Sequence, residues 1–163
     1  MGVSRDIKQC VPLLQTVWKY VSEHYPKRYP EAPRLILVET FRSLAVQEAY
    51  YAQGRKSQAQ INKLREAAGL YLLDADEAKR IITKKQPGTS NHGAVDANGQ
   101  PASRAFDVGF VDKEGKMDWS ERNYQRVATI IREAFPAVTW GADWDQDGQT
   151  SDEKFIDMPH FEV

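Results

Sequence analysis

The chain ends on the stretch Asp157-Met158-Pro159-His160-Phe161-Glu162-Val163, and this stretch predicts how the rest of the molecule is arranged. It places a carboxylate three residues before a histidine, with a proline between them. Chain termini usually fray, so a terminus with this much potential chemistry must be tied into a core and must meet partners from upstream. The best upstream candidates are His92, in Ser90-Asn91-His92, and Asp107, in Ala105-Phe106-Asp107.

Two histidines and one carboxylate are a common ligand set for zinc, with a fourth position left open. The expected ligands are His92, Asp107 and His160. Asp107 stands in an apolar run, where a carboxylate is costly unless a partner or a metal compensates its charge. Asp157 is then available as a base. Because Pro159 restricts the backbone, a bend rather than a helical turn is expected between Asp157 and His160.

Composition places the chain among ordinary soluble globular proteins. Its 163 residues suit one domain, with 41% hydrophobic and 28% charged residues. The net charge of −1 offers no basic field for nucleic acid or an anionic membrane. Cys10 is the one cysteine, which excludes an internal disulfide and a cysteine zinc site. We find no signal peptide and no run long enough to insert into a membrane, so synthesis is expected in the cytoplasm.

Hydrophobic periodicity predicts an α+β fold, with a small, mostly antiparallel sheet flanked by helices and a zinc site at its centre. Pro12 either opens the first helix or kinks it, and Pro26 begins an extended connector. Residues 83–104 form a long loop rich in Gly, Ser and Asn. The expected helices are 6–25, 44–53, 57–68, 74–82 and 120–135, and the expected strands are 34–40, 105–111, 137–140 and 155–163.

Two motifs carry a resemblance to a known family. Ser90-Asn91-His92 and Ala105-Phe106-Asp107 supply the two ends of the pattern S-x-H-x-x-G-x-A-x-D. Residues 140–144, Trp-Gly-Ala-Asp-Trp, and the D-x-x-H of residues 157–160 supply a second pattern. Residues 39–43 and 51–55 resemble the segments that lead into and out of the first conserved helix of the same family. Over residues 34–163 the chain thus resembles the zinc-dependent peptidoglycan peptidases. That group contains D,D-carboxypeptidases and L-alanyl-D-glutamate endopeptidases, including small phage endolysins.

The resemblance implies a role for each matching residue. His92, Asp107 and His160 would bind zinc, and Asp157 would be the catalytic base. Arg42 would stabilise charge on the substrate or on the tetrahedral intermediate, the alternative being a surface cation near a strand end. Ser90 would contact substrate or orient its loop.

The chain departs from the family pattern between the first histidine and the aspartate. Fourteen residues, 93–106, separate His92 from Asp107, and the segment 93–104 looks like an insertion. Asp96 also reads A-x-D and is therefore a rival ligand. We prefer Asp107, since Phe106-Asp107-Val108 has strand character whereas Asp96 sits between turn residues.

An acidic loop forms a second departure. Asp143, Asp145, Asp147 and Gly148 match the first, third, fifth and sixth positions of an EF-hand calcium loop. Lys154 replaces the final glutamate, and a strand rather than a helix is expected before the loop, so it is not an EF-hand proper. The loop either binds calcium weakly, with Asp152 or Glu153 completing the ligands, or is a solvated acidic turn.

The predicted function is that of a zinc metallopeptidase that hydrolyses an amide bond in the stem peptide of bacterial peptidoglycan. The resemblance implies an L-alanyl-D-glutamate endopeptidase endolysin, with D,D-carboxypeptidase specificity as an alternative. The insertion favours another reading, a non-catalytic domain that binds peptidoglycan or metal on the same fold. A calcium-responsive interaction domain is a third. We expect a monomeric, single catalytic domain over 1–163 without a wall-binding module. It would act on the cell wall in the periplasm, in the host cell of a phage or in a bacterium of its own.

Overall fold

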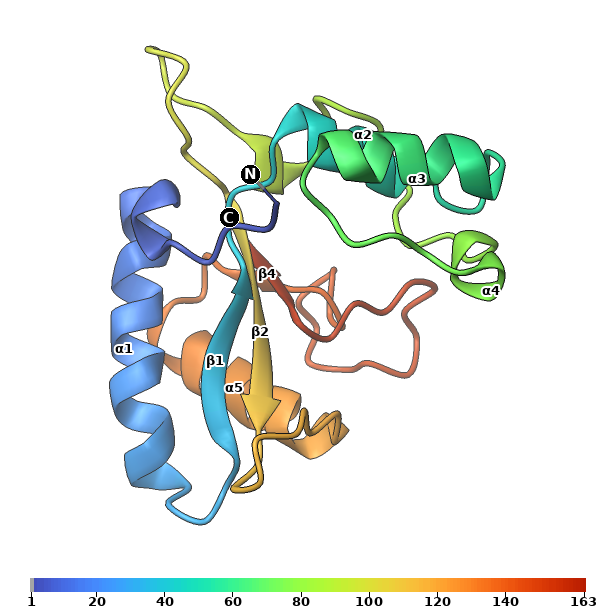
Figure 1. Ribbon diagram of the computed structural model, residues 1–163. Helices are drawn as coiled ribbons and strands as arrows, with labels where there is room; N and C mark the ends of the chain where they lie inside the picture. Colours follow the sequence, from blue (N-terminus) through green and yellow to red (C-terminus); the bar gives the residue numbers. More distant parts are fainter. Residues whose placement is uncertain (1) are drawn as a thin grey trace.

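Four strands form one antiparallel sheet in the order β1-β2-β4-β3 in the computed structural model, which describes residues 2–163 (Figure 1). The predicted α+β class is confirmed. The strands are β1 (Arg34–Glu39), β2 (Ala105–Val111), β3 (Thr139–Trp140) and β4 (His160–Glu162). The helices are α1 (Pro12–Arg28), α2 (Leu44–Ala52), α3 (Gln58–Ala67), α4 (Ala75–Ala78) and α5 (Glu121–Ala134), with short 3₁₀ turns η1 (Ile7–Gln9) and η2 (Asn91–Gly93).

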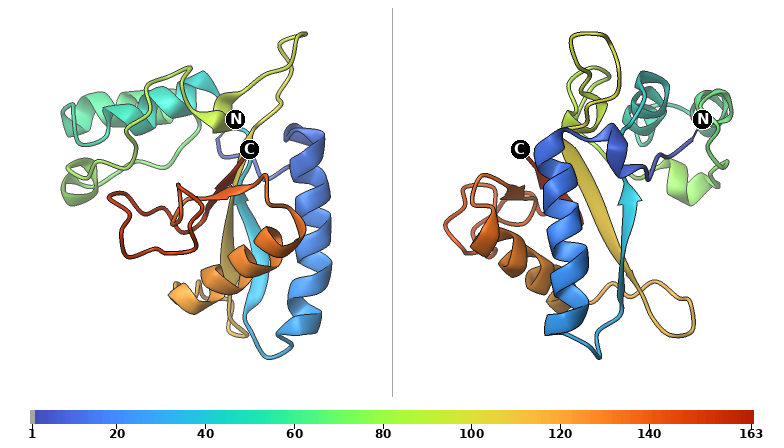
Figure 2. Two further views of the ribbon diagram at one scale, coloured as in Figure 1. Left: turned by 180° about the vertical axis from the view of Figure 1, so that it is seen from behind. Right: turned by 90° about the vertical axis from the view of Figure 1, so that its left-hand side faces the viewer.

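One face of the sheet packs against α1 and α5 (Figure 2). Alternate residues of a strand point to opposite faces, and Phe106, Val108 and Phe110 of β2 all lie in the main core. Phe161 of β4 joins them, and Trp18 of α1 meets the Phe106 ring edge-on at a centroid distance of 6.0 Å. The residues between these positions, including Asp107, therefore belong to the opposite face.

Helices α2, α3 and α4 lie together above the sheet in Figure 1, around their own small cluster of buried residues. The side chain of Ser43 accepts the Val46 N–H at the start of α2, and Ser57 forms the expected capping box with Gln60 at the start of α3. Within residues 2–163, no helix is long and apolar enough to cross a membrane.

Several predicted boundaries were wrong. Pro12 opens α1 at its first turn, and residues 7–9 form the separate turn η1. The helix continues through Pro26 to Arg28, because Tyr25 packs into the core and the Tyr29 N–H still donates to its carbonyl at 2.9 Å. The predicted helix 74–82 keeps only Ala75–Ala78, and the predicted last strand keeps only His160–Glu162.

Candidate metal centre

The pairing of the strands places Asp107 and His160 side by side. The two residues are direct cross-strand partners of β2 and β4, and such partners project from the same face at close range. On the other side of β2, Glu39 of β1 also pairs with Asp107. It does so only because a bulge between Leu37 and Glu39 shifts the register. Bulges near active sites commonly re-aim a side chain in this way. A row of polar side chains thus crosses three strands.

His92 reaches this row from η2, outside the sheet. The Ser90 side chain accepts the His92 N–H at 3.3 Å, and the His92 carbonyl accepts the Arg42 N–H at 2.9 Å. These bonds fix the turn that carries His92, whose side chain is only 3% exposed.

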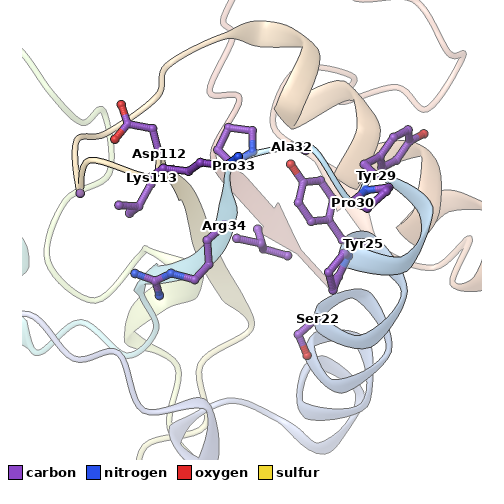
Figure 3. Close-up of a pocket in the computed structure, with 13 residues that line it drawn as sticks. Ser22, Tyr25, Tyr29, Pro30, Ala32, Pro33, Arg34, Asp112 and Lys113 are labelled. Atoms are coloured by element: carbon purple, nitrogen blue, oxygen red, sulfur yellow. The ribbon is translucent and has the colours of Figure 1, made fainter.

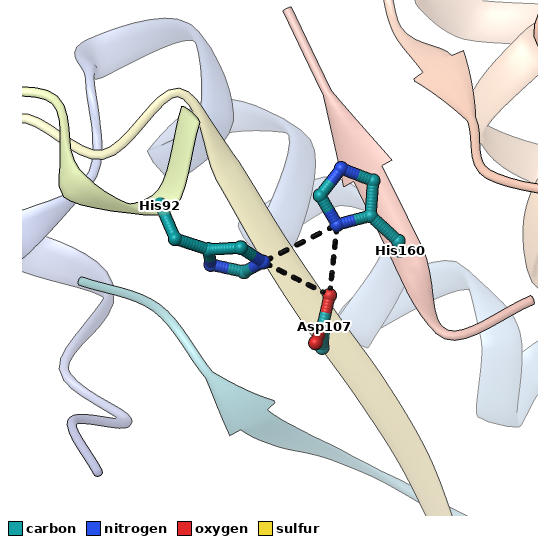
Figure 4. Close-up of side chains that lie close together, drawn as sticks. All are labelled: His92, Asp107 and His160. Atoms are coloured by element: carbon teal, nitrogen blue, oxygen red, sulfur yellow. Dashed lines mark hydrogen bonds and ion pairs between the residues drawn. The ribbon is translucent and has the colours of Figure 1, made fainter. Parts of the chain in front are cut away.

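One atom each of His92, Asp107 and His160, the three residues that we call the triad, converges on a common point (Figure 4). His92 Nε2 lies 3.2 Å from His160 Nδ1 and 3.2 Å from Asp107 Oδ1, and His160 Nδ1 lies 3.1 Å from Asp107 Oδ1. Ligands placed tetrahedrally at zinc-like distances are separated from one another by about 3.3 Å. The triangle therefore has the size that a zinc-like ion requires.

The outer ring nitrogens of both histidines are also engaged. His92 Nδ1 lies 2.7 Å from the Thr40 carbonyl, and His160 Nε2 lies 2.7 Å from Glu162 Oε1. Since each outer nitrogen donates its proton to an oxygen, each inner nitrogen of a neutral ring presents a lone pair toward the centre. Two lone pairs and a carboxylate oxygen at this spacing repel one another unless a cation lies among them, so the donor set fits a divalent metal.

The pKa shifts of His160 and Asp107 also indicate that a positive charge is needed at the centre of the site. Burial disfavours a charged His160, but its hydrogen bonds to Asp107 and Glu162 outweigh burial and raise its pKa to about 9. For Asp107, burial opposes ionisation, yet hydrogen bonds from His160 and His92 lower its pKa far below the usual range. Without a metal, a proton on His160 takes the place of the cation.

Asp157 lies beside the triad, at the bend before β4. The Asp157 N–H donates to the Gly141 carbonyl at 2.6 Å, and the Asp157 carbonyl accepts the His160 N–H at 3.1 Å. Burial raises the pKa of the Asp157 carboxyl, and the charge of Asp107 raises it further, whereas His160, His92 and Arg42 lower it. The structure thus places this carboxyl within the electrostatic field of all three candidate ligands.

Arg42 lies beside Glu39 and is largely buried, so it is not a surface cation. Its guanidinium forms an ion pair with Glu39, donates to Gln47 Oε1 at 3.0 Å and lies 4.8 Å from the centroid of the Tyr50 ring. Its side chain is 12% exposed. The structure places Ser90 at the N-cap of η2, the position that orients the His92 loop.

The segment 93–104 leaves the site as a hairpin, the yellow loop at the top left of Figure 1. Its neck is closed by hydrogen bonds from the Ala102 N–H to the Ala94 carbonyl and from the Arg104 N–H to the Asn91 carbonyl, both at 2.9 Å. Asp96 sits at its exposed end, where its side chain accepts backbone N–H groups of the turn. The neck returns the chain to β2, so Asp107 meets His92 and Asp96 does not.

The acidic loop brings together three of its predicted residues. Asp143, Asp145 and Asp147 each offer an oxygen within 4.8 Å of the others, whereas Asp152 is exposed and lies outside this group. Asp143 is 1% exposed, and its Oδ2 accepts bonds from Arg132 at 2.6 Å and from the Gly148 N–H at 3.0 Å. Its Oδ1 is buried and has no hydrogen-bond partner among residues 2–163.

A row of aromatic rings leads from the surface to the triad. Phe155 is exposed and stacks on Trp144 at a centroid distance of 6.3 Å, and Trp144 lies 5.7 Å from the His160 ring. The Lys84 ammonium lies 5.1 Å above the Phe155 ring. This row gives an extended ligand an apolar surface beside the metal centre.

A cavity lies elsewhere, beside the connector from α1 to β1 (Figure 3). Its volume is about 540 Å³, and tyrosine and proline side chains line it together with Arg34 and Lys113. None of the triad residues lines this cavity. The group formed by His92, Asp107 and His160 lies instead at the sheet face opposite the main core.

Sequence reasoning missed the residues that orient the ligands, namely Glu39, Thr40, Asn91 and Glu162. One signal was available. Glu162 stands two residues after His160, so a strand at the C-terminus places both side chains on one face. No such signal exists for Thr40, whose carbonyl contacts His92 across 52 residues.

Comparison with solved structures finds similarity to a crystal structure of the L-Ala D-Glu endopeptidase ChiX from Serratia marcescens. The match covers 99% of this chain and 87% of that chain, at 18% identity and a TM-score of 0.46. Neither a scan against models of protein families nor a search of curated proteins finds a match.

Proposed function

We propose that the chain is a zinc metallopeptidase that hydrolyses an amide bond in the stem peptide of bacterial peptidoglycan. The observation that carries this proposal is the convergence of His92 Nε2, His160 Nδ1 and Asp107 Oδ1, with the Asp157 carboxyl beside them. The two sequence motifs support the choice of substrate. The bond favoured by the resemblance is the one between L-alanine and D-glutamate, and D,D-carboxypeptidase specificity is the alternative.

His92, Asp107 and His160 would hold the metal, which supplies Lewis-acid activation of water and of the scissile carbonyl when bound. The remaining chemistry belongs to the chain's own groups. Asp157 accepts the proton of the attacking water and delivers it to the leaving amine. Burial and the charge of Asp107 raise the pKa of Asp157, whereas the charge of Arg42 lowers it and so favours the ionised carboxylate that this step requires.

The proposal also gives Arg42 a role, which depends on where its guanidinium lies. Its ion pair with Glu39 and its bond to Gln47 hold the guanidinium beside Glu39, the cross-strand partner of Asp107, and within electrostatic range of Asp157. There it stabilises negative charge that develops on the substrate. The stem peptide would lie along Trp144 and Phe155, whose exposed faces it would cover.

The proposal extends to the biological setting. Residues 1–163 would act as one monomeric catalytic unit, made in the cytoplasm and acting on the wall in the manner of a small phage endolysin. The closed neck of the insertion leaves His92 and Asp107 in contact at 3.2 Å, which supports an intact metal site, and the alternative of a non-catalytic domain that binds peptidoglycan or metal is tested by the release of peptides.

Digestion of purified peptidoglycan, followed by mass spectrometry of the released peptides, tests the function and identifies the bond. We expect cleavage that a chelator abolishes and added zinc restores. Asp157→Asn should lower the rate by about 10²–10⁴-fold, the usual contribution of a general base, without changing thermal stability in the metal-loaded state by more than a few degrees. Asp76→Asn, an exposed change on α4, is the control. Cleavage by Asp157→Asn at the control rate would refute the proposal.

A further inference from the structure

Glu162 connects the two segments that carry the histidines. Its Oε1 lies 2.7 Å from His160 Nε2, and its Oε2 accepts a hydrogen bond from the Asn91 side-chain amide. Asn91 directly precedes His92 in η2. One carboxylate therefore contacts the histidine of β4 and the turn that carries the other histidine.

The two histidines differ in what holds their outer nitrogens. His92 meets a neutral backbone carbonyl, that of Thr40, whereas His160 meets the charged carboxylate of Glu162. A carboxylate partner fixes the tautomer and raises the basicity of a ligand imidazole more than a carbonyl does. Each histidine lies on an element of only three residues, His92 on η2 and His160 on β4, so side-chain contacts must help to hold both rings.

Two contacts tie the end of β4 to the neighbouring segments. In the first contact, Glu162 accepts a hydrogen bond from Asn91, and Glu162 also contacts the His160 ring. The other is formed by Arg104, whose Nε donates to the Val163 carbonyl and whose own carbonyl accepts the Val163 N–H, both at 2.9 Å. Neither hydrogen bond of this second contact involves the His160 ring, so Arg104 can serve as a control.

We propose that Glu162, oriented by Asn91, is the positioning residue for His160, holding its ring with Nδ1 toward Asp107 and His92 and thereby setting metal affinity. The proposal rests on the metal-binding part of the proposed function and not on the peptidase reaction. Glu162 acts through His160 and does not contact the substrate. Asn91 acts through Glu162, so removing both side chains should cost no more affinity than removing Glu162 alone.

The test is zinc affinity, measured by competition with a chelator on the purified full chain. Loss of an outer partner of a metal ligand typically lowers affinity by about 10–100-fold, and we expect Glu162→Ala to fall in this range. Asn91→Ala should give a smaller loss, and the double variant should match Glu162→Ala. Glu162→Gln, which keeps an acceptor, should recover part of the affinity. Arg104→Ala should bind zinc as the wild type does.

Cobalt substitution adds a readout of geometry. We expect the visible absorption spectrum of the cobalt-loaded protein to change in Glu162→Ala and not in Arg104→Ala. If Glu162→Ala fails to fold without metal, Glu162→Gln and Asn91→Ala carry the test. Wild-type zinc affinity in the Glu162 variants, or an equal loss in Arg104→Ala, would overturn the positioning role. A wild-type protein that binds zinc tightly but releases no peptide would instead refute the peptidase function and leave this role intact.

Discussion

Gly141→Ala is expected to disable the site while leaving most of the fold in place. Gly141 follows β3 and lies against the bend that carries Asp157. Its N–H donates to the His160 carbonyl at 2.7 Å, and its carbonyl accepts the Asp157 N–H at 2.6 Å. A Cβ at this position would lie 3.0 Å from the Cβ of His160 and 3.1 Å from the Asp157 carbonyl carbon, and closer still to the Asp157 oxygen.

The size of the effect follows from these distances. Ordinary contacts of a Cβ begin at 3.4 Å, so the bend must move away by an amount on the order of 1 Å, as expected for overpacking at a closely packed site. Overpacking costs about 1–3 kcal/mol, and weakening the two hydrogen bonds adds about 1 kcal/mol for each. We expect the free energy of unfolding to fall by about 3–5 kcal/mol. A 1 Å misplacement of catalytic groups can lower the rate by about 10²-fold.

The assay pairs urea unfolding with peptidoglycan hydrolysis. Gly99→Ala is the matched control, because Gly99 has a φ of +74° and a Cβ there meets nothing within 4 Å in the described part of the chain. This control should lose about 1 kcal/mol from its left-handed backbone and keep full activity. Gly141→Ala with wild-type activity would refute the reasoning, since it would show that the site tolerates the displaced bend.

Four further outcomes follow from the site and its surroundings. Zinc binding at pH 7 should release about one proton, because the pKa of His160 in the metal-free protein is raised to about 9. Above that pH the proton release should vanish. Calorimetry in buffers of different ionisation enthalpy measures the number of protons released. By the same shift, His160 stabilises the metal-free fold below pH 6.5, and this contribution is lost as the pH rises through about 9. Millimolar calcium should raise the melting temperature by binding Asp143 Oδ1, which has no hydrogen-bond partner among residues 2–163, together with Asp145 and Asp147. Asp147→Asn should abolish the rise, and an unchanged melting temperature in the wild type would identify a solvated acidic turn. Replacing residues 95–101 by a short turn should leave zinc affinity unchanged, and a loss of zinc binding would contradict the role of the neck.

The parts of the fold that the sequence predicts well are those in which one residue type repeats at a regular spacing. Phe106, Val108 and Phe110 alternate with Asp107, and this alternation alone places a carboxylate on the face opposite the core. The capping box at Ser57 is equally local. Such features depend on neighbours in the chain, so the chain shows them directly.

The features that the sequence did not predict depend on contacts between distant segments. The bulge before Glu39 exists because β1 must pair with β2, and nothing in Leu37-Val38-Glu39 announces it. Helix α1 passes through Pro26 because Tyr25 is buried against the sheet. The triad combines both kinds of information. The sequence motifs predict which residues form the triad. The orientation of the two histidine rings depends on contacts with the Thr40 carbonyl and the Glu162 carboxylate, and these contacts form only in the folded chain.

The insertion between His92 and Asp107 shows why a disrupted motif can still form an intact site. The motif S-x-H-x-x-G-x-A-x-D has about six residues between its histidine and its aspartate, whereas this chain has fourteen. Slightly more than doubling the length of a connection costs only about 0.7 kcal/mol in loop-closure entropy. Each of the two backbone hydrogen bonds that close the neck contributes about 1 kcal/mol, so the neck offsets the added length. The position of Asp107 is then set by its pairing with Glu39 and His160 across the sheet and not by its distance along the chain from His92. Spacing within a motif is therefore a weak criterion wherever a hairpin can close on itself, and pairing across strands is the stronger one.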